Sequence, residues 1–321
     1  MMDEVVDVCR GGRPRQPVVD GVINVHKNKG YTSHDVVAIV RKTFSGAVGT
    51  KIKVGHTGTL DPDATGVLPV CLGKATKIAD YIMADVKAYT AEIIFGTATD
   101  TQDASGSVIA EKATNFTEEQ FHAALESFIG EYTQIPPMYS AVKVGGKKLY
   151  ELAREGKEVA RKPRLVEIFG ITVQSAELPR RAVICVECSK GTYIRTLCAD
   201  LGERLGGLAH MGELTRTRSG NFCIENSVEI DEIKRRAGEG TLCEIVTPIE
   251  QALPLPQAVA CEACEKIMYN GGKLNSRDMT FRREPNEGEL LFVVNKEGAL
   301  VGLYEYTQGI LKPRTMLLGG L

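Results

Sequence analysis

Several common functional signatures are missing from this sequence of 321 residues. No apolar run approaches the roughly 20 residues that a membrane-spanning helix needs, so no membrane association is predicted. No G-x-G-x-x-G motif occurs, and the segment GVLPVCLGK (66–74) has six residues between its glycines, where a phosphate-binding P-loop has four. These absences argue against a dinucleotide-binding enzyme and a P-loop NTPase, and no cofactor is predicted.

Metal-binding patterns are also sparse. The five histidines show no ligand spacing, and the CxxC pairs at 185–188 and 261–264 are separated by roughly 70 residues, too many for a zinc ribbon. Cys185 and Cys188 fall in a predicted strand, where an offset of three places them on opposite faces. No metal is therefore predicted, and a partial site at Cys261 and Cys264 is the one alternative left open.

The cysteine content and the N-terminus indicate a cellular compartment. Nine cysteines lie scattered along a long chain, and MMDEVVDVCRGGRPRQ at its start does not resemble a signal peptide. This combination predicts a cytoplasmic protein with reduced thiols. Residues 1–19 are expected to form a flexible leader. The net charge of −2 excludes an indiscriminate polycation but permits a local basic surface.

Hydrophobic periodicity and turn residues predict a mixture of helices and strands without regular alternation, which is typical of an α+β fold. Strands are expected at 21–27, 88–96, 164–178 and 181–189, and helices at 32–44, 116–130 and 191–207. Ser33 is the expected N-cap of the first helix, and Thr117 with Gln120 forms a capping box for the second. After a linker at 254–257, short strands predict a small β-rich domain with a hairpin around 295–298.

A strongly basic segment lies near the middle of the chain. Residues 143–164 contain eight Lys or Arg against three Glu. A solvated helix face and a phosphate-binding surface are equally good explanations of this bias.

An acidic residue in a glycine-rich loop is the strongest candidate for chemistry. The stretch KVGHTGTLDPDATGVLP (53–69) places Asp61 before Pro62, which restricts the backbone of Asp61 to extended conformations. A lone aspartate can act as a nucleophile towards an electrophilic carbon, and it then needs a cation that keeps it ionised. Arg195, at the start of a predicted helix, is a candidate partner. A simple turn-forming role for Asp61 remains the alternative.

Four segments resemble, in order and spacing, the signature blocks of the TruB-type tRNA pseudouridine-55 synthases. They are GHTGTLDPDATGVLPVCLGKATK (55–77), KAYTAEIIFGTATDTQDASG (87–106), QIPPMYSAVKVGGKKLYELAREG (134–156) and CSKGTYIRTLCADLG (188–202). The resemblance covers roughly residues 20–252. It implies an isomerase that detaches the uracil of one T-loop uridine and rejoins it to the ribose through carbon.

The resemblance also implies roles for individual residues. Asp61 would be the nucleophile, Tyr89 would stack on the target uracil and move a proton, and Arg195 would hold Asp61 as a carboxylate. His56 would fill the gap left by the flipped base. Leu214 would close the apolar side of the pocket, supported by Tyr193 and Lys74. One early turn departs from the family pattern: Lys-Pro-x-Gly is Lys27-Asn28-Lys29-Gly30 here.

The resemblance implies a domain plan and a partner as well. A catalytic domain at 20–252, on a mixed and mainly antiparallel sheet with flanking helices, would carry an RNA-clamping insertion at about 134–164. Lys143, Lys147 and Lys148 in this insertion would contact phosphates of the T-arm. Residues 255–321 would form a PUA-like RNA-binding domain. The implied partner is tRNA, with no obligatory protein partner.

The same residues are compatible with three other functions. A guide-RNA-dependent ribosomal pseudouridine synthase shares the aspartate loop but lacks the long 134–156 block. A tRNA-folding chaperone would use the same pocket, and base flipping would already open the tRNA elbow. A glycoside hydrolase would need a second catalytic carboxylic acid, and neither Asp63 nor Asp80 shows any sign of that role.

Overall fold

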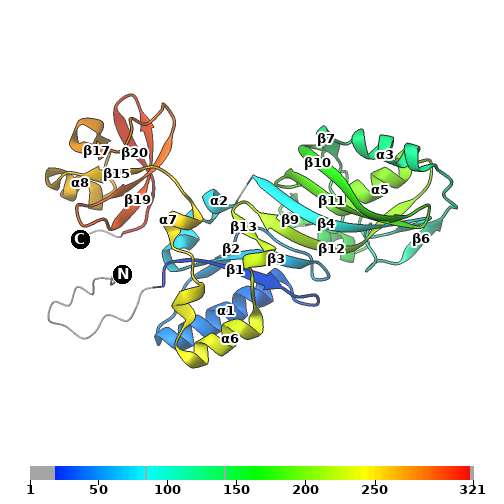
Figure 1. Cartoon of the computed structure of the whole chain (residues 1–321), viewed down its shortest axis with the longest axis horizontal. Coiled ribbons are helices and arrows are strands. Elements are labelled where there is room, and N and C mark those ends of the chain that lie inside the picture. Colours follow the sequence, from blue (N-terminus) through cyan, green and yellow to red (C-terminus); the bar gives the residue numbers. More distant parts are fainter. Residues whose placement is uncertain (1–18, 84, 141, 319–321) are drawn as a thin grey trace.

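The computed structural model describes residues 19–83, 85–140 and 142–318. The predicted leader lies outside these residues, except for Val19. Two main β-sheets organise the described chain, a large one in the body and a smaller one at the C-terminal end (Figure 1). This arrangement confirms the predicted α+β fold with a β-rich C-terminal domain. No helix in the described ranges is long and apolar enough to cross a membrane.

The large sheet is mixed and mainly antiparallel, as predicted. Only the pairings of β1 with β14 and of β3 with β12 are parallel within it. Two short strands, β2 (Val54–His56) and β13 (Phe222–Cys223), pair with β3 and β12 at its side. The order of the main path is β14 (Val228–Glu229), β1 (Gly21–Lys27), β3 (Thr65–Leu72), β12 (Ala209–Ser219), β4 (Val86–Phe95), β11 (Arg181–Ser189), β10 (Arg164–Glu177) and β7 (Gly130–Gln134).

Two pairs of helices flank this sheet at different places. Helices α1 (Ser33–Val48) and α6 (Ile230–Glu239) pack together below β1 and β3 in Figure 1, whereas α5 (Ile194–Arg204) packs on β12 and β4 and contacts α3 (Glu118–Glu126). The shorter helices are α2 (Ala79–Ile82), α4 (Leu149–Arg154), α7 (Ile249–Ala252) and α8 (Glu265–Tyr269), with 3₁₀ turns at Gly73–Ile78, Ile224–Asn226, Leu242–Ile245, Glu262–Cys264 and Ser276–Asp278.

Local sequence signals explain several of these elements. In β4 the odd-numbered residues from Lys87 to Phe95 are buried, which confirms the predicted alternation. The capping box of Thr117 and Gln120 begins α3 as expected. The prediction that Ser33 caps α1 is wrong: Thr32 is the N-cap and forms a capping box with Asp35. Ser33 is instead buried, and its hydroxyl bonds to the backbone of Leu60.

Strand β3 is the main element that the sequence did not predict. Its residues, TGVLPVCL, are buried almost throughout because apolar clusters cover both faces of the sheet at this strand, with Leu68, Val70 and Leu72 in one cluster and Val67 and Cys71 in another. The run therefore lacks the polar–apolar alternation of a half-exposed strand. This strand begins four residues after Asp61. We call residues 57–64, which connect β2 to β3, the aspartate loop, and both of its ends are fixed in the sheet.

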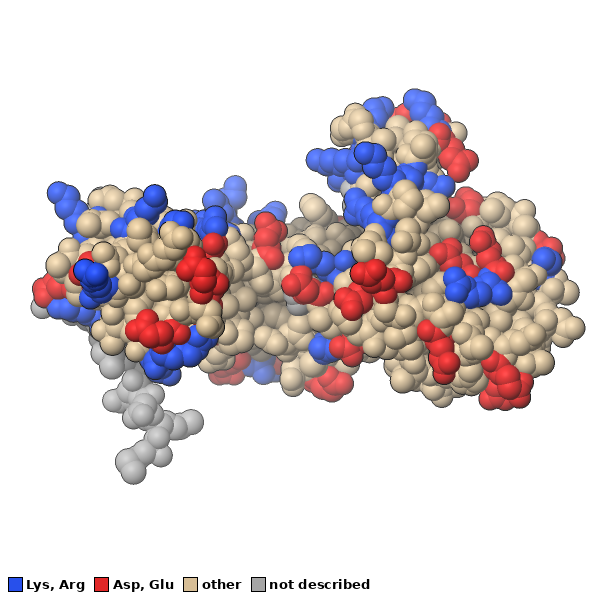
Figure 2. All heavy atoms as spheres, turned by 90° about the horizontal axis from the view of Figure 1, so that it is seen from above, with Lys and Arg blue, Asp and Glu red and all other residues tan. Residues whose placement is uncertain are grey.

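Two hairpins extend from the large sheet. Strands β5 (Thr97–Thr99) and β6 (Val108–Glu111) form one, and β8 (Lys143–Val144) with β9 (Lys147–Lys148) forms the other, which leads into α4. Figure 2 shows a knob rich in Lys and Arg that rises above the body at the position of β9 in Figure 1. We call residues 143–164, which include the second hairpin, the basic segment.

The C-terminal sheet has its own core and also packs against the body. Its strand order is β16 (Leu274–Asn275), β20 (Ile310–Met316), β19 (Leu300–Thr307), β18 (Leu290–Val294), β15 (Gln257–Ala260) and β17 (Met279–Phe281). The predicted hairpin turn is present between β18 and β19, where the Gly298 N–H bonds to the Asn295 carbonyl at 3.0 Å. A second apolar cluster lies between the two sheets. It contains Phe292 and Leu303 of the C-terminal sheet, Leu317 just after β20, and Val67 and Ile78 of the body.

Candidate active site around Asp61 and Arg195

Three buried side chains form hydrogen bonds to the backbone of the aspartate loop and of β3. The hydroxyl of Ser33 accepts the Leu60 N–H at 2.9 Å and donates to the Leu60 carbonyl at 3.1 Å. The fully buried Lys27 donates to the Pro62 carbonyl at 3.0 Å. Arg216, also fully buried, donates from Nε to the Val67 carbonyl at 2.7 Å and from Nη2 to the Gly58 carbonyl at 3.2 Å. The loop is therefore fixed in place by buried cations that bond to its own backbone.

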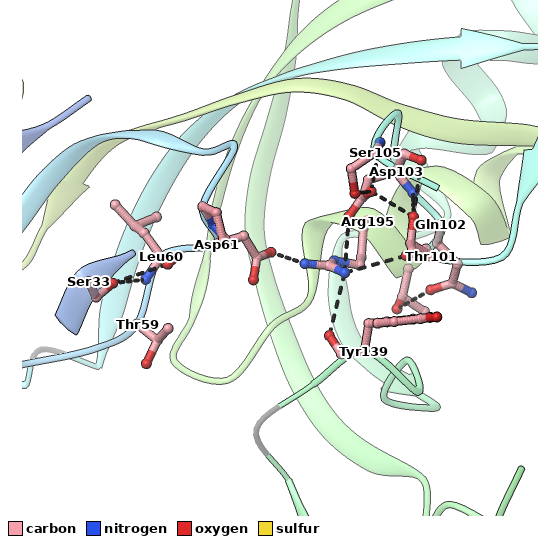
Figure 3. A network of polar contacts seen from close by, with 12 residues as sticks. Ser33, Thr59, Leu60, Asp61, Thr101, Gln102, Asp103, Ser105, Tyr139 and Arg195 are labelled. Carbon is pink, nitrogen blue, oxygen red and sulfur yellow. Dashed lines mark hydrogen bonds and ion pairs between the residues drawn. The ribbon is translucent and has the colours of Figure 1, made fainter. Parts of the chain in front are cut away.

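Arg195 lies at the centre of a two-carboxylate network (Figure 3). Its Nη2 pairs with the Asp61 carboxylate, and its Nη1 lies 3.0 Å from Asp103 Oδ2. Nη1 also donates to the carbonyls of Thr101 and Tyr139, at 3.4 Å each. The Arg195 side chain is only 6% exposed, whereas that of Asp61 is 44% exposed. Asp61 therefore keeps a charged partner while remaining open to an incoming molecule.

Asp103 is a functional candidate that the sequence analysis missed. Its Oδ1 accepts hydrogen bonds from the Thr101 hydroxyl at 2.7 Å and from the Ser105 N–H at 3.0 Å, which leaves Oδ2 for Arg195. Asp103 lies in the quoted block 87–106, but local sequence does not distinguish it from its neighbour Asp100. Only the fold shows that one of these two aspartates reaches the arginine.

Tyr89 and Leu214 line the sheet beside this network. Both are buried, Tyr89 on β4 and Leu214 on the adjacent strand β12, where it lies opposite Ala91. Burial raises the pKa of Tyr89 above its ordinary value, so its side chain is a neutral phenol at neutral pH. Tyr89 thus supplies an aromatic ring and a neutral O–H group on β4, and Leu214 supplies an apolar side chain on the adjacent strand.

The other predicted site residues, Tyr193, His56 and Lys74, come from three different parts of the fold. Tyr193 is the N-cap of α5, two residues before Arg195, and its N–H and carbonyl both bond to the Gln134 side chain at 2.9 Å. His56 ends β2, and its Nδ1 accepts the Gly58 N–H at 3.2 Å. Lys74 lies apart from these groups: its ammonium is 3.3 Å from Asp20, and no described contact links it to Asp61.

The three lysines predicted to touch RNA lie on the second hairpin. Lys143 and Lys148 are opposite one another in the β8–β9 pair. Lys147 forms an ion pair with Glu155 at 3.0 Å, and the Lys148 ammonium lies 5.3 Å from the ring centre of Tyr150. These groups could hold a polyanion, but none contacts the Asp61 network.

The two CxxC pairs lie in different environments. Cys188 is buried and Cys185 is partly exposed on the other face of β11. Cys261 and Cys264 lie with their sulfurs 3.5 Å apart. Among residues 19–83, 85–140 and 142–318, no three His, Cys, Asp or Glu side chains come together as metal ligands.

Comparisons with known proteins identify two domain families in the chain. The TruB family pseudouridylate synthase N-terminal domain matches residues 42–194, and the tRNA pseudouridylate synthase B C-terminal domain matches residues 195–254. Curated relatives carry the name tRNA pseudouridine synthase B. The protein from Clostridium tetani is 43% identical over 90% of this chain and 96% of its own length, and the Bacillus subtilis protein is 41% identical over 94% and 98%.

Two solved structures with a similar fold come from larger assemblies. A chain from the crystal structure of a Cbf5-Nop10-Gar1 complex matches with a TM-score of 0.71 and 27% identity, covering 94% of this chain and 86% of that one. A chain from an H/ACA RNP bound to a substrate RNA matches with a TM-score of 0.69 and 24% identity, covering 94% of this chain and 86% of that one. At this identity the match shows similarity of fold alone.

Proposed function

Because this chain belongs to the TruB family of pseudouridylate synthases, we propose that it isomerises a tRNA uridine to pseudouridine at position 55 in the T-loop, with Asp61 as the nucleophile. The observation that carries the proposal is the pairing of a partly exposed Asp61 with a buried Arg195. An arginine in this position keeps the aspartate ionised, which a nucleophile requires.

The reaction exchanges one bond of the nucleotide for another. The bond between N1 of uracil and C1′ of the ribose breaks, and a bond between C5 of uracil and C1′ forms. The proton on C5 leaves and N1 gains one, so the atoms balance without a cofactor. Asp61 forms a transient covalent bond to one of the two fragments, either the ribose or the base ring, and this bond breaks again before the product leaves.

Tyr89 and Leu214 would hold the detached uracil while it turns. The Tyr89 ring stacks on the base, and its neutral O–H moves a proton. Leu214 closes the apolar side, and Tyr193 positions the start of α5. Since a stacked base is out of reach of Asp61, the uridine must leave the loop, and His56 fills the gap.

Surfaces away from the reacting atoms would bind the rest of the tRNA. The basic segment clamps the T-arm through phosphate contacts, to which Lys143, Lys147 and Lys148 contribute. We assign residues 255–321 as a PUA-like RNA-binding domain, and further Lys and Arg side chains gather at that end of the molecule in Figure 2. The protein would work in the cytoplasm.

The presence of the 134–156 block favours an enzyme that works without a guide RNA or partner proteins. The Cbf5 chain with the similar fold was solved with Nop10 and Gar1, and a guide-RNA-dependent role is the nearest alternative. A tRNA-folding activity is a second candidate function, supported by the separation of the basic segment from Asp61. A glycoside hydrolase fits less well, because Asp103, the second carboxylate here, is largely buried against Arg195.

Pseudouridine mapping tests the assignment directly. Purified protein and unmodified tRNA should yield pseudouridine at the T-loop uridine with no other macromolecule added. Cells that lack the protein should have uridine at that position. Persistence of pseudouridine there, with no compensating enzyme in those cells, would contradict the proposed function.

A further inference from the structure

A buried lysine outside the proposed catalytic set lies directly beside it. Lys87 stands two residues before Tyr89 on β4, and both side chains are on the buried face of that strand. Lys87 is only 7% exposed. Its strand neighbours are Cys188 on β11 and Ser219 on β12, neither of which carries a carboxylate.

The Lys87 ammonium points at the aspartate loop. A β-carbon added to Gly58 would lie 3.0 Å from Lys87 Nζ and 3.8 Å from Arg216 Nη1, so two cations converge beneath this residue. Gly58 has a φ of 139°, in the region that favours glycine. Its N–H bonds to Nδ1 of His56, which leaves Nε2 of the neutral imidazole as a free donor.

The other buried cations of this region have oxygen partners, whereas Lys87 has none in the described chain. Arg216 donates to loop carbonyls, and Lys27 donates to the carbonyls of Asn28 and Pro62. No hydrogen bond or ion pair of the Lys87 ammonium is present among the described residues. A largely buried ammonium without an anion is costly, and pairing with an anion offsets part of that cost.

We propose that Lys87 forms a subsite for a backbone phosphate of the RNA strand next to the flipped uridine. This inference rests on the proposed function, because the strand must run over the aspartate loop to deliver the base to Asp61. A phosphate suits the subsite because an ammonium is a point charge that binds phosphate oxygens without a fixed plane.

The charge of Lys87 makes this contact dependent on pH. Burial, assisted by Arg216 and Lys190, lowers its pKa to about 8, and the opposing Cys188 thiol, whose pKa is about 11, is neutral in this range. His56 stays neutral because burial, His34, Arg216 and Lys87 lower its pKa. A bound phosphate favours the ammonium, so affinity should be highest below pH 8 and fall by up to tenfold per pH unit above it.

Three variants of the full-length protein test the subsite. Binding of unmodified tRNA is measured in an Asp61→Asn background, as a function of salt and pH. Lys87→Met should raise Kd about tenfold or more, reduce the slope of log Kd against log salt by about one, and remove part of the pH dependence. Lys87→Arg should keep the salt slope but lose the same part of the pH dependence, since its charge is permanent. Lys234→Met, an exposed lysine on α6 paired with Asp231, is the control for net charge.

Stability and turnover separate this role from a structural one. Lys87→Met removes a buried unpaired charge, so its melting temperature should equal or exceed that of the parent. In the otherwise wild-type enzyme it should raise KM more than it lowers kcat. Equal affinity, salt slope and pH profile in parent, Lys87→Met and Lys87→Arg would overturn the subsite. Absence of pseudouridine formation by the wild-type protein would instead overturn the proposed function.

Discussion

At the scale of single residues, one guanidinium serves two carboxylates with different surroundings. Asp61 is 44% exposed and Asp103 is 12% exposed, although both pair with Arg195. The exposed carboxylate can meet an electrophilic carbon, whereas the buried one is saturated by hydrogen bonds to Thr101 and Ser105. We infer that Asp61 reacts and that Asp103 positions Arg195.

Replacing Asp61 by asparagine should separate chemistry from binding. The change removes the nucleophile but keeps the shape, so single-turnover pseudouridine formation should fall by several orders of magnitude. Binding of tRNA should persist because phosphate contacts do not need this carboxylate. Folding should persist too, because Arg195 keeps Asp103 as a partner. Rapid-quench assays measure the chemistry, binding titrations measure tRNA affinity and thermal melting measures folding.

The control is Asp63→Asn, the same change at an exposed residue of the same loop. It should leave the rate near that of the wild type. Measurable single-turnover product from well-folded Asp61→Asn would refute the nucleophile assignment. If that variant still accelerates tRNA folding, the chaperone activity is independent of the chemistry.

A substitution at Asp103 tests the positioning of Arg195. In Asp103→Asn the oxygen that binds Thr101 and Ser105 can remain, while an amide group replaces the oxygen that faces Arg195. Misplacing the guanidinium should lower kcat by about 10²-fold with a smaller change in KM. Asp100→Asn, an exposed aspartate that accepts only the Ser107 N–H, is the matched control. Equal loss in both variants would mean that the loop fold, and not Arg195, is responsible.

At the scale of elements, the basic segment and the aspartate loop illustrate two ways of placing side chains. The loop is anchored in the sheet by β2 and β3 and by buried Arg216. The hairpin of β8 and β9 turns through Gly145 and Gly146, both with positive φ, and carries its lysines away from the core. The anchored loop suits a reacting group that must stay in one position, whereas the glycine turn lets the hairpin adapt to a polyanion.

Removing three charges from the hairpin should weaken binding more than catalysis. Replacing Lys143, Lys147 and Lys148 by glutamine should raise Kd and reduce the salt slope by about one unit per lost phosphate contact. The salt slope should fall by less than one unit for each of the three lysines, because Lys147 already pairs with Glu155 and is less available to a phosphate. Fluorescence binding titrations at several salt concentrations provide the measurement.

A triple glutamine change on α6, at Lys234, Arg235 and Arg236, alters the net charge equally and serves as control. These three side chains pair with acidic residues of the same region. If the hairpin and α6 variants show the same salt slope, the basic segment is an ordinary solvated surface.

At the scale of the whole molecule, the C-terminal sheet is joined to the body by apolar packing as well as by the linker. Phe292 and Leu303 are fully buried in the cluster they share with Val67 and Ile78. The Lys77 ammonium also donates to the Met316 carbonyl at 2.9 Å across this junction. The linker at 254–257 therefore marks where the chain passes between two sheets that share an apolar contact.

Ending the chain at Ala252 should consequently cost stability as well as RNA affinity. Uncovering a buried Ile or Val costs about 1.5–3 kcal/mol per side chain, and several such residues face the C-terminal sheet. We expect a melting temperature several degrees lower, with uridine isomerisation retained below it and a raised KM for tRNA. Calorimetry and initial rates measure these effects. An unchanged melting temperature would show that the junction contributes little.

Phe292→Ala in the full-length chain is the finer probe of the same junction. It should destabilise the protein by about 3–5 kcal/mol while leaving every residue around Asp61 in place. A matched change at a partly exposed aromatic of the same sheet, Phe281→Ala, should cost less because less of its surface is buried.

Features that depend on neighbours along the chain can be predicted from the sequence alone. The alternation of β4, the capping box of α3 and the Asp61–Pro62 pair are local patterns, and they were predicted correctly or led directly to the candidate nucleophile. Three other features depend on how the strands pack in space: β3 is a buried central strand, Asp103 and not Asp100 reaches Arg195, and the side chains of Lys87 and Arg216 both approach Gly58. These pairings join residues that are distant in the sequence or indistinguishable by type. Their selection depends on sheet register and burial, which arise only when the strands pack.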